Sequence, residues 1–420
     1  MKLRILALLG TSAAAALMAT AAMADTTPAA APPPPPPAPT ASPYPAMSAD
    51  IALPAPPTTV DLGFLGKVSV GGVISAFAQS QSNPVFNFVT GKLDQTSSVD
   101  LSNAQIFINK SDGVFQYYIQ AGTYSLPQLG PSAYQTSSHT PALTFGNLPQ
   151  GFVKIVPNST FSVEVGALPT LVGDEYTFSF ENLNVERGLL WAYEPAVSRG
   201  VQANLTEGPL AVSLAFTDGY YSNKYNALSG LATWTIDGSD TLAADFEVPL
   251  SKQYVSTFVT SPVLNNSSIY NIMYTRTQGQ WIINPYIQYV SVPSLPKVFA
   301  PGPLLQSETS WGAALLVNYT FDSKSPLTGF SVPVRVEYVS NSGAPNTAFQ
   351  PDLLFAPGSK VWSFTITPTY QYKNYFVRVE GSYVSATKID PYAAFFGTAY
   401  GTFGDKKDQV RGIIETGAAF

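Results

Sequence analysis

The chain has 420 residues, of which only 11% are charged and 13% are aromatic, and its formal net charge is −6. Soluble domains average about 25% charged residues, so the composition disfavours an ordinary soluble domain. The acidic balance argues against nucleic acid as a partner, because no cluster of Lys and Arg is present to neutralise phosphates. Cysteine is absent, which excludes disulfides, cysteine metal sites and thiol catalysis.

The N-terminal part of the chain lies outside the expected fold. Residues 1–24 are typical of a secretory signal, with a charged start, an apolar stretch and a small-residue cleavage site that ends at Ala24. An uncleaved anchor is the alternative. Residues 25–59 are rich in Pro and Ala and predict an extended, polyproline-like periplasmic segment without a core.

Residues 60–420 predict an all-β fold. From Val68 onward, apolar and polar residues alternate in segments of about ten, which is typical of strands with one lipid-facing and one water-facing side. The clearest segment runs from Val361 to Tyr372, where aromatic and apolar residues alternate with Ser, Thr and Gln. No segment after the signal approaches the ~20 apolar residues that a membrane helix needs. A secreted β-sandwich or solenoid is the alternative fold.

About sixteen segments follow this pattern, with short turns and longer polar loops alternating between them. An even number of antiparallel strands, with short turns on one side and long loops on the other, is typical of a bacterial outer-membrane barrel. We therefore predict a transmembrane antiparallel β-barrel of ~16 strands, with its short turns in the periplasm. The predicted strands are residues 68–79, 98–109, 114–124, 150–157, 160–167, 200–206, 209–217, 229–237, 241–247, 268–277, 281–290, 310–321, 331–340, 360–372, 375–385 and 409–420.

The last predicted strand ends in Phe420. Outer-membrane barrels commonly end in an aromatic residue, which resembles a signal that the assembly machinery reads. In register with the alternation of this strand, Val410, Ile414 and Phe420 would face lipid, whereas Arg411 and Glu415 would face the lumen.

A charged insert interrupts the alternation after the fifth predicted strand. It runs from roughly Leu168 to Ser198, and a structureless stretch of this length in a compact domain is usually functional or disordered. We expect it to fold into the mouth or lumen of the barrel and to narrow it. The candidate pore-constriction residues are Asp174, Glu175, Glu181, Glu186, Arg187, Glu194 and, just beyond the insert, Arg199.

Charged residues on inward-facing positions of the strands form a candidate lumen wall. In a closed ring, the strands that carry arginine stand roughly opposite the insert, so a basic wall would face an acidic loop and its field would sort solutes by charge. The alternative is local neutralisation, because Glu337, Glu380 and Glu415 lie close in sequence to the arginines and could pair with them across strands. The candidate wall residues are Arg335, Arg378, Arg411, Glu164, Asp245 and Glu247.

The stretch from Gly166 to Glu175, GALPTLVGDE, resembles a motif of the OmpL-like β-barrel porin family. In that motif a strand ends in Gly, a short linker with Pro follows, and Gly-x-Glu opens a constriction loop. Asn184–Arg187 and Tyr193–Gly200 resemble later elements of the same pattern, although Arg199 stands where His is expected. The resemblance implies an outer-membrane channel and implies no particular solute.

No catalytic constellation is found in the sequence. The single histidine, His139, lies in a predicted outer loop beside serines and lacks the third group that a nucleophile–base pair needs, so we do not expect an enzyme. Asp174, Glu175 and Glu181 could bind Ca²⁺, but their spacing is unlike that of an EF-hand. We therefore expect no metal and no cofactor.

The sequence as a whole predicts an outer-membrane porin that lets small hydrophilic solutes and ions diffuse through a water-filled barrel. The expected partners are outer-membrane lipid and lipopolysaccharide, the solutes, and the barrel-assembly machinery through Phe420. A homotrimer is suggested only by analogy with general porins. The alternatives are a structural or adhesive barrel without a significant open pore and, less favoured, an outer-membrane hydrolase.

Overall fold

The computed structural model describes residues 51, 58–87, 91–296, 305–344, 350–351, 353–389 and 399–420. The predicted signal, residues 1–24, lies outside the described residues, as does the Pro- and Ala-rich segment apart from residues 51, 58 and 59. Within the described part of the chain, no helix is long and apolar enough to cross a membrane.

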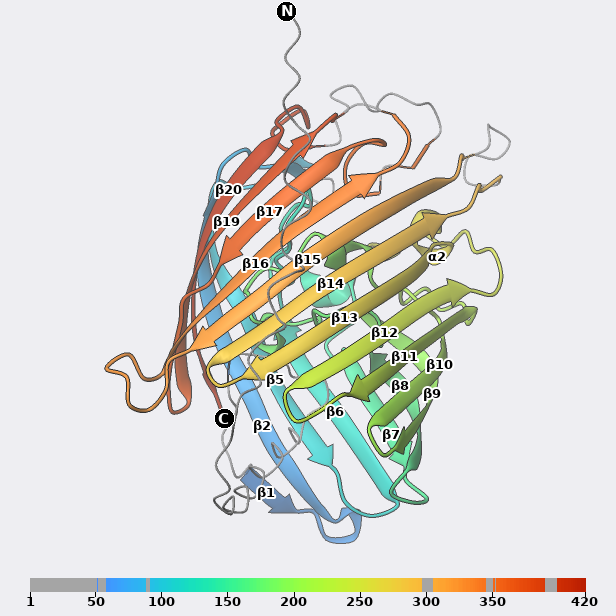
Figure 1. Cartoon of the computed structure of the whole chain (residues 1–420), viewed down its shortest axis with the longest axis vertical. Coiled ribbons are helices and arrows are strands. Elements are labelled where there is room, and N and C mark those ends of the chain that lie inside the picture. The colour runs from blue at the N-terminus through green and yellow to red at the C-terminus, as the bar shows by residue number, and fades with distance from the viewer. Residues whose placement is uncertain are drawn as a thin grey trace, which may run out of the picture. The chain divides into compact units, whose positions relative to one another are not determined.

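The described strands form a closed antiparallel β-barrel (Figure 1). The ring closes at β2 (Lys67–Gln81), which pairs with β5 (Ser97–Lys110) along one edge and with β20 (Asp408–Ala419) along the other. Every other strand pairs with its neighbours in chain order. These strands are β6 (Phe115–Tyr124), β7 (Gln150–Ile155), β8 (Phe161–Pro169), β9 (Val197–Glu207), β10 (Leu210–Thr217), β11 (Ala227–Thr235), β12 (Asp240–Pro249), β13 (Ser268–Gln278), β14 (Trp281–Val292), β15 (Glu308–Thr320), β16 (Phe330–Asn341), β17 (Lys360–Ile366), β18 (Thr369–Tyr372) and β19 (Tyr375–Thr387).

In the described residues the barrel sheet holds 18 strands. They make up 16 passes of the chain along the barrel wall, which are called crossings below. β17 and β18 are two halves of one crossing, since both lie between β16 and β19. The break falls at Thr367 and Pro368, because proline has no N–H to donate to the ladder. The eighteenth strand, β1 (Thr58–Asp61), is a short addition to β2. The predicted all-β barrel of ~16 strands is therefore confirmed.

The remaining elements are short and lie in connections. β3 (Phe86–Asn87) pairs with β4 (Lys92–Leu93) in the loop after β2. The helical turns are η1 (Gly63–Leu65), α1 (Thr140–Leu143), η2 (Ser179–Glu181), η3 (Leu190–Tyr193) and α2 (Pro262–Asn265).

Side chains alternate between the two faces of the wall as the sequence predicts. In β20, Val410 and Ile414 are each 56% exposed, whereas Arg411 and Glu415 are 5% and 0% exposed. The same two-residue period governs the other strands, because successive side chains in a strand point to opposite faces. The outward face is therefore apolar, and the charged residues of the strand point inward.

Aromatic pairs lie across neighbouring strands on the outer face. Tyr289 and Trp311 have ring centroids 4.5 Å apart near the loop end of β14 and β15. Trp281 and Tyr319, 4.7 Å apart, form a similar pair near the turn end of the same two strands. Two belts of aromatic residues that flank an apolar band are typical of a barrel in a membrane, where amphipathic rings sit at the headgroup level.

Ile51 and the first two residues of β1, Thr58 and Thr59, are the described parts of the segment that the sequence predicts to be extended and without a core. β1 pairs with residues 67–70 of β2, just beyond the point where Phe420 exchanges two backbone hydrogen bonds of 2.7 and 2.9 Å with Gly72. Ile51 is 2% exposed and belongs to a cluster with the inward-facing Val73, Phe107 and Phe376. Residue 51 therefore lies inside the barrel, and residues 58 and 59 belong to the sheet.

Candidate functional site

The insert between β8 and β9 lies across the inside of the barrel. β8 and β9 are the fifth and sixth of the sixteen crossings, so the thirteenth and fourteenth, β16 and β17 with β18, stand opposite them in the ring. The insert reaches that opposite side: Asn184 Nδ2 donates to Thr367 Oγ1 at 2.7 Å, and the Val185 N–H donates to Glu380 Oε2 of the neighbouring β19 at 2.6 Å. Most of its side chains are buried.

Short-range hydrogen bonds give the insert its shape. The Tyr176 N–H donates to Asn182 Oδ1 at 2.7 Å, and Asn182 Nδ2 donates back to the carbonyls of Tyr176 and Phe178 at 2.9 and 2.7 Å. Asn182 thereby closes a turn around η2. Further on, Gly188 donates to Glu175 Oε2 at 2.7 Å. A Cβ at Gly188 would lie 2.2 Å from Glu337 Oε1 and 2.6 Å from Glu175 Oε2, so a larger residue here would displace these two carboxylates.

Arg335 of β16 joins the insert to the wall. Its guanidinium is fully buried, forms an ion pair with Glu175, and donates to the Glu186 carbonyl at 2.8 Å. Glu337, two residues along the same strand, lies 3.4 Å from Arg335 Nε. Buried charges of this kind are retained only with several partners, because taking each ion out of water is costly.

Arg378 of β19 and Arg411 of β20 bind the insert in the same way. Arg378 donates to the Ser179 carbonyl at 2.9 Å and to the carbonyls of Asn182 and Leu183 at 3.0 Å each, and it lies 3.3 Å from the Glu415 carboxylate. Arg411 forms an ion pair with Glu186. All three candidate wall arginines therefore hold the insert.

These contacts correct the predicted arrangement of charge. The sequence predicts a basic wall that faces an acidic loop across the lumen, but the arginines touch the loop directly. Local neutralisation by strand carboxylates accounts for part of the pairing, through Glu337 and Glu415. Glu380 instead accepts from the backbone N–H groups of Val185 and Glu186 at 2.6 and 2.9 Å.

The other side of the insert carries acidic groups that face acidic groups of the wall. Asp174 accepts from Asn284 Nδ2 at 2.7 Å, and the Gly173 N–H donates to Asp245 at 3.1 Å. Glu194 accepts from the Tyr286 hydroxyl and from Gln288 Nε2. In the part of the chain that the structure describes, no basic side chain forms an ion pair with Asp174, Glu194, Asp245 or Glu247. Burial raises the pKa of Asp174 to about 6.

Glu181 and Arg187 lie in the interior of the insert. Burial raises the pKa of Glu181 to about 8, although its carboxylate accepts from the Phe178 N–H at 3.0 Å. The Arg187 guanidinium lies 5.6 Å from the ring centre of Trp191. The Arg187 backbone pairs with the loop after β6, where its carbonyl accepts from the Leu129 N–H at 2.9 Å. A second loop thus packs onto the insert.

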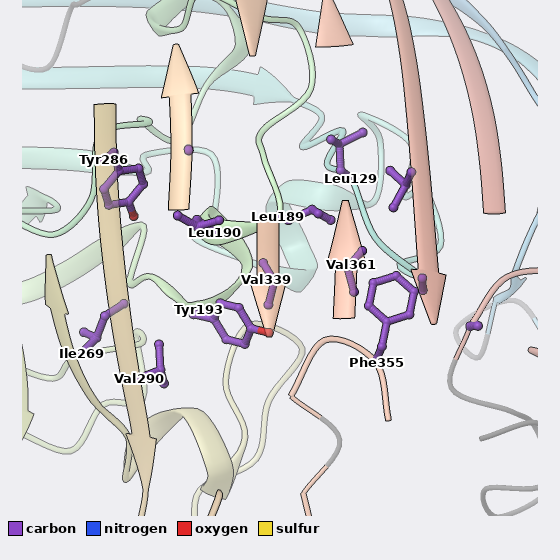
Figure 2. Packing of buried hydrophobic residues seen from close by; sticks show 14 of the residues in the cluster. Leu129, Leu189, Leu190, Tyr193, Ile269, Tyr286, Val290, Val339, Phe355 and Val361 are labelled. Atoms are coloured by element: carbon purple, nitrogen blue, oxygen red, sulfur yellow. The ribbon is translucent and has the colours of Figure 1, made fainter. Parts of the chain in front are cut away.

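An apolar cluster fills the space between the insert and one side of the wall (Figure 2). Leu189, Leu190 and Tyr193 of the insert pack against inward-facing residues such as Val339 of β16 and Ile269 of β13. Around the insert, the interior of the barrel therefore holds a packed apolar core in addition to its polar lining. The sequence does not predict this core.

Arg199 and Glu164 lie apart from the insert. Arg199 is in β9, where it forms an ion pair of 2.7 Å with Asp218 and stacks 3.9 Å from the ring centre of Tyr221. The prediction that Arg199 belongs to the constriction is therefore wrong, because Asp218 and Tyr221 both belong to the loop after β10. Glu164 faces inward and pairs with Lys154 of β7 at 2.9 Å.

Sequence reasoning missed three polar residues of β14 that touch the insert. Asn284 binds Asp174, whereas Tyr286 and Gln288 bind Glu194. They occupy alternate positions opposite the outward Trp281 and Ile287, so the two-residue period marks them as inward-facing. No such pattern in the sequence predicts that these three residues contact the insert.

The candidate calcium ligands and His139 have separate partners in the structure. Within the described residues, no group of three or more His, Asp or Glu is placed to hold a metal ion. Asp174, Glu175 and Glu181 each point to a different partner. His139 precedes α1, and its Nδ1 lies 3.3 Å from Thr136 Oγ1.

A closed 16-crossing barrel with an apolar outer face and charged residues inside defines a β-barrel of the outer-membrane porin type. Residues 67–420 match the family described as "Putative beta-barrel porin-2, OmpL-like", and the chain belongs to this family. The family and the fold place it among outer-membrane barrels. A comparison with curated protein sequences finds no match.

Solved structures share the fold at low sequence identity. An anion-selective porin from Comamonas acidovorans is 10% identical, with a TM-score of 0.52, over 84% of this chain and 99% of that one. OmpT of Vibrio cholerae, an outer membrane protein, matches in a loop-deletion form with the same identity, TM-score and coverage. Outer-membrane-expressed OmpT gives a TM-score of 0.51.

Proposed function

We propose that the protein is a porin through which small hydrophilic solutes and ions diffuse, and that the insert sets the narrowest part of the path. The observation that carries the proposal is the bonding of the insert to Arg335, which lies on the far side of the ring, and to Arg378 and Arg411 on β19 and β20. A loop held across a barrel lumen reduces its free cross-section, and charged groups there act in a narrow space where screening is weak. The proposal includes no catalysis.

We further propose a mild preference for cations. The wall arginines are neutralised by the carboxylates that they contact, whereas Asp174, Asp245 and Glu247 lack ion-pair partners among the described residues. Unpaired carboxylates attract cations into a narrow lumen. Because burial raises the pKa of Asp174 to about 6, this preference should be weaker in acid.

Single-channel recording in a planar bilayer tests both proposals. Removal of residues 177–183 from the insert should raise the conductance, and Asp174→Asn should shift the reversal potential in a salt gradient toward anions. Asp322→Asn provides the matched control, because Asp322 is exposed in a short turn and salt screens such charges beyond ~8 Å at physiological ionic strength. Unchanged conductance in the shortened variant would show that the insert is not the constriction.

A barrel without a significant open pore is the second candidate. The packed apolar cluster around Leu189, Leu190 and Tyr193 favours it, since such packing leaves little room for water (Figure 2). The same recordings separate the two functions. A closed barrel should give no conductance steps in the natural protein and should give steps only after the insert is shortened.

The proposed partners follow from the outer face and the last strand. The aromatic pairs of β14 and β15 suit contact with membrane lipid and lipopolysaccharide, and Phe420 suits recognition by the barrel-assembly machinery. Deletion of Phe420 should lower the amount of membrane-inserted protein. Chemical crosslinking in native membranes tests the homotrimer that analogy suggests.

A further inference from the structure

A cavity of about 260 Å³ lies on the hairpin that β13 and β14 form, close to its turn. Its lining residues are Arg276, Gln278, Trp281 and Ile283. The register pairs Arg276 with Ile283 and Gln278 with Trp281, so the four side chains surround one patch of the hairpin. Trp281 and Ile283 are exposed on the outer face of the barrel, and the cavity therefore opens toward the membrane.

The cavity lies at the level of the lipid headgroups. Trp281 packs against Tyr319 in one of the aromatic pairs near the turn end, and aromatic belts lie at the two surfaces of the membrane around a barrel. Arg276 shares the outer face with Ile272, four positions away on the same strand. A charged side chain on this face is tolerated near the headgroups and is costly in the middle of the bilayer. A lipid phosphate can therefore reach Arg276.

Hydrogen bonds hold the Arg276 guanidinium in one orientation. Its Nη1 donates to the two carboxylate oxygens of Asp240 at 3.2 and 3.1 Å, and its Nε and Nη2 donate to Gln278 Oε1 at 3.2 and 2.8 Å. Nη2 uses one of its two N–H groups for Gln278, so a phosphate oxygen at the cavity can accept the other. A group fixed in this way loses little conformational freedom when it binds a ligand.

The carboxylates beside Arg276 select the kind of headgroup. Asp240 accepts from the Tyr274 hydroxyl at 2.6 Å as well as from Arg276, and Asp237 in the adjacent turn also acts on Arg276 electrostatically. One positive and two negative side chains give this part of the surface an excess of negative charge. It therefore opposes a headgroup that carries only a phosphate and favours one that also carries a positive group.

The outer face beyond the cavity suits acyl chains. Ile283 lines the cavity, and the exposed Ile272 and Ile287 pair across the same two strands farther from the turn. The polar groups thus lie at one end of an apolar strip that runs along the hairpin toward the middle of the wall. A phospholipid has the same order of polar head and apolar chains.

We propose that this cavity binds one phosphatidylethanolamine molecule, a phospholipid whose headgroup carries a phosphate and a primary ammonium group. The phosphate bonds to Arg276, the ammonium group bonds to Asp240, and the glycerol region packs against Trp281. With the short turns in the periplasm, as the sequence predicts, this lipid belongs to the inner leaflet. The site depends on a membrane-embedded barrel and not on solute diffusion through the lumen.

Native mass spectrometry of the full chain in detergent micelles tests the site with phosphatidylethanolamine, phosphatidylcholine and phosphatidylglycerol of identical acyl chains. We expect one bound phosphatidylethanolamine, and about fivefold weaker binding of phosphatidylglycerol, which lacks the positive group. Phosphatidylcholine, which is positive but has no ammonium N–H, should lie between them. Arg276→Met should weaken phosphatidylethanolamine binding about tenfold, as the loss of a charged hydrogen bond implies. Asp240→Asn should remove the preference over phosphatidylglycerol.

Lys373→Met is the matched control, because Lys373 is a cation in another short turn, 5.3 Å from the Tyr372 ring centre, and does not line this cavity. Heat-modifiable mobility on gels shows whether each variant is folded, and Arg276→Gln replaces Arg276→Met if the latter is not. The proposal is overturned if the natural protein binds phosphatidylglycerol as tightly as phosphatidylethanolamine, if the folded Arg276 variant binds like Lys373→Met, or if Asp240→Asn keeps the preference. These measurements require no open pore, so their failure is distinct from a failure of the proposed porin function.

Discussion

The fully buried Arg335 side chain forms ion pairs with Glu175 and Glu337 and donates a hydrogen bond to the Glu186 carbonyl. Removing one partner of such a group leaves an uncompensated buried charge, which costs about 3–5 kcal/mol. Arg335→Met should therefore release the insert locally while the barrel stays closed. Hydrogen exchange of the backbone amides of residues 173–190 should accelerate at least tenfold.

The control for this prediction is Arg276→Met. Arg276 lies near a short turn and pairs with Asp240 at 3.1 Å with its side chain 40% exposed, and exposed pairs contribute only about 0–1 kcal/mol. Equal exchange in the two variants would mean that Arg335 does not anchor the insert.

Ionisation of Glu181 should make the stability of the insert depend on pH. Burial raises its pKa to about 8, well above the value of about 4.3 for an exposed Glu. A carboxyl group that binds its proton more tightly in the folded state stabilises that state when protonated, and the contribution is lost as the pH rises through about 8. Exchange of the insert amides, corrected for intrinsic rates, should therefore increase between about pH 5 and about pH 9.

Glu181→Gln cannot ionise and should remove most of this increase. Asp174, with a pKa of about 6, contributes at the lower end of the same range. A natural protein whose insert exchanges at one corrected rate across the range would contradict the assignment of a buried, protonated Glu181.

At the scale of the element, the two faces of one strand should respond differently to the same charge. In β10, Leu214 faces outward and is exposed, whereas Ser213 faces inward and donates to Asn204 at 2.7 Å. Leu214→Arg should cost about 2–4 kcal/mol of barrel stability, because arginine is placed in the apolar part of the bilayer. Ser213→Arg should cost much less.

Urea unfolding of both variants in lipid vesicles measures this difference. The natural protein and Leu214→Ala, which shortens the outward side chain without adding charge, are the references. Similar losses for the two arginine variants would show that β10 does not separate lipid from lumen.

The strands could be predicted from sequence because apolar and polar residues alternate within each of them. The two faces of the segment from Val361 to Tyr372 were assigned correctly, and its break at Pro368 follows from the missing N–H of proline. The partners of the insert could not be predicted in this way. Whether Glu175 meets Arg335 or water depends on the path of a loop over 160 residues of sequence separation, and no local pattern encodes that path.

Arg199 shows the same limit at the edge of an element. The charge density of the insert predicts that Arg199 belongs to the constriction, but β9 begins at Val197, three residues before the predicted strand. Arg199 therefore pairs with Asp218 in the next loop. An error of a few residues at a strand boundary is enough to move a side chain from one site to another.

At the scale of the whole molecule, closure of the ring depends on one glycine. Gly72 of β2 exchanges backbone hydrogen bonds with Phe420, and a Cβ at this position would lie 2.6 Å from the Phe420 ring and 2.7 Å from the Gln105 carbonyl. Gly72→Val should therefore disturb the pairing of the first and last strands. We expect a loss of heat-modifiable, membrane-inserted protein.

Gly381→Val and Gly412→Val serve as controls, since a Cβ at either position meets no atom within 4 Å. Both lie in strands next to the seam, so they match the test variant in composition and neighbourhood. If all three variants insert equally well, the contact between Gly72 and Phe420 does not limit closure.

The attachment points of the insert also make it an internal strut. Its ends continue into β8 and β9, and its middle is bonded to β16, which stands opposite them, and to β19 and β20. An empty ring of strands can flatten into an ellipse when the surrounding bilayer presses on it, whereas a strut resists compression along the diameter that it spans. The barrel should therefore be stiff along the line from β8 to β16 and softer at right angles to it. Lateral pressure would then narrow the cross-section mainly at right angles to the insert.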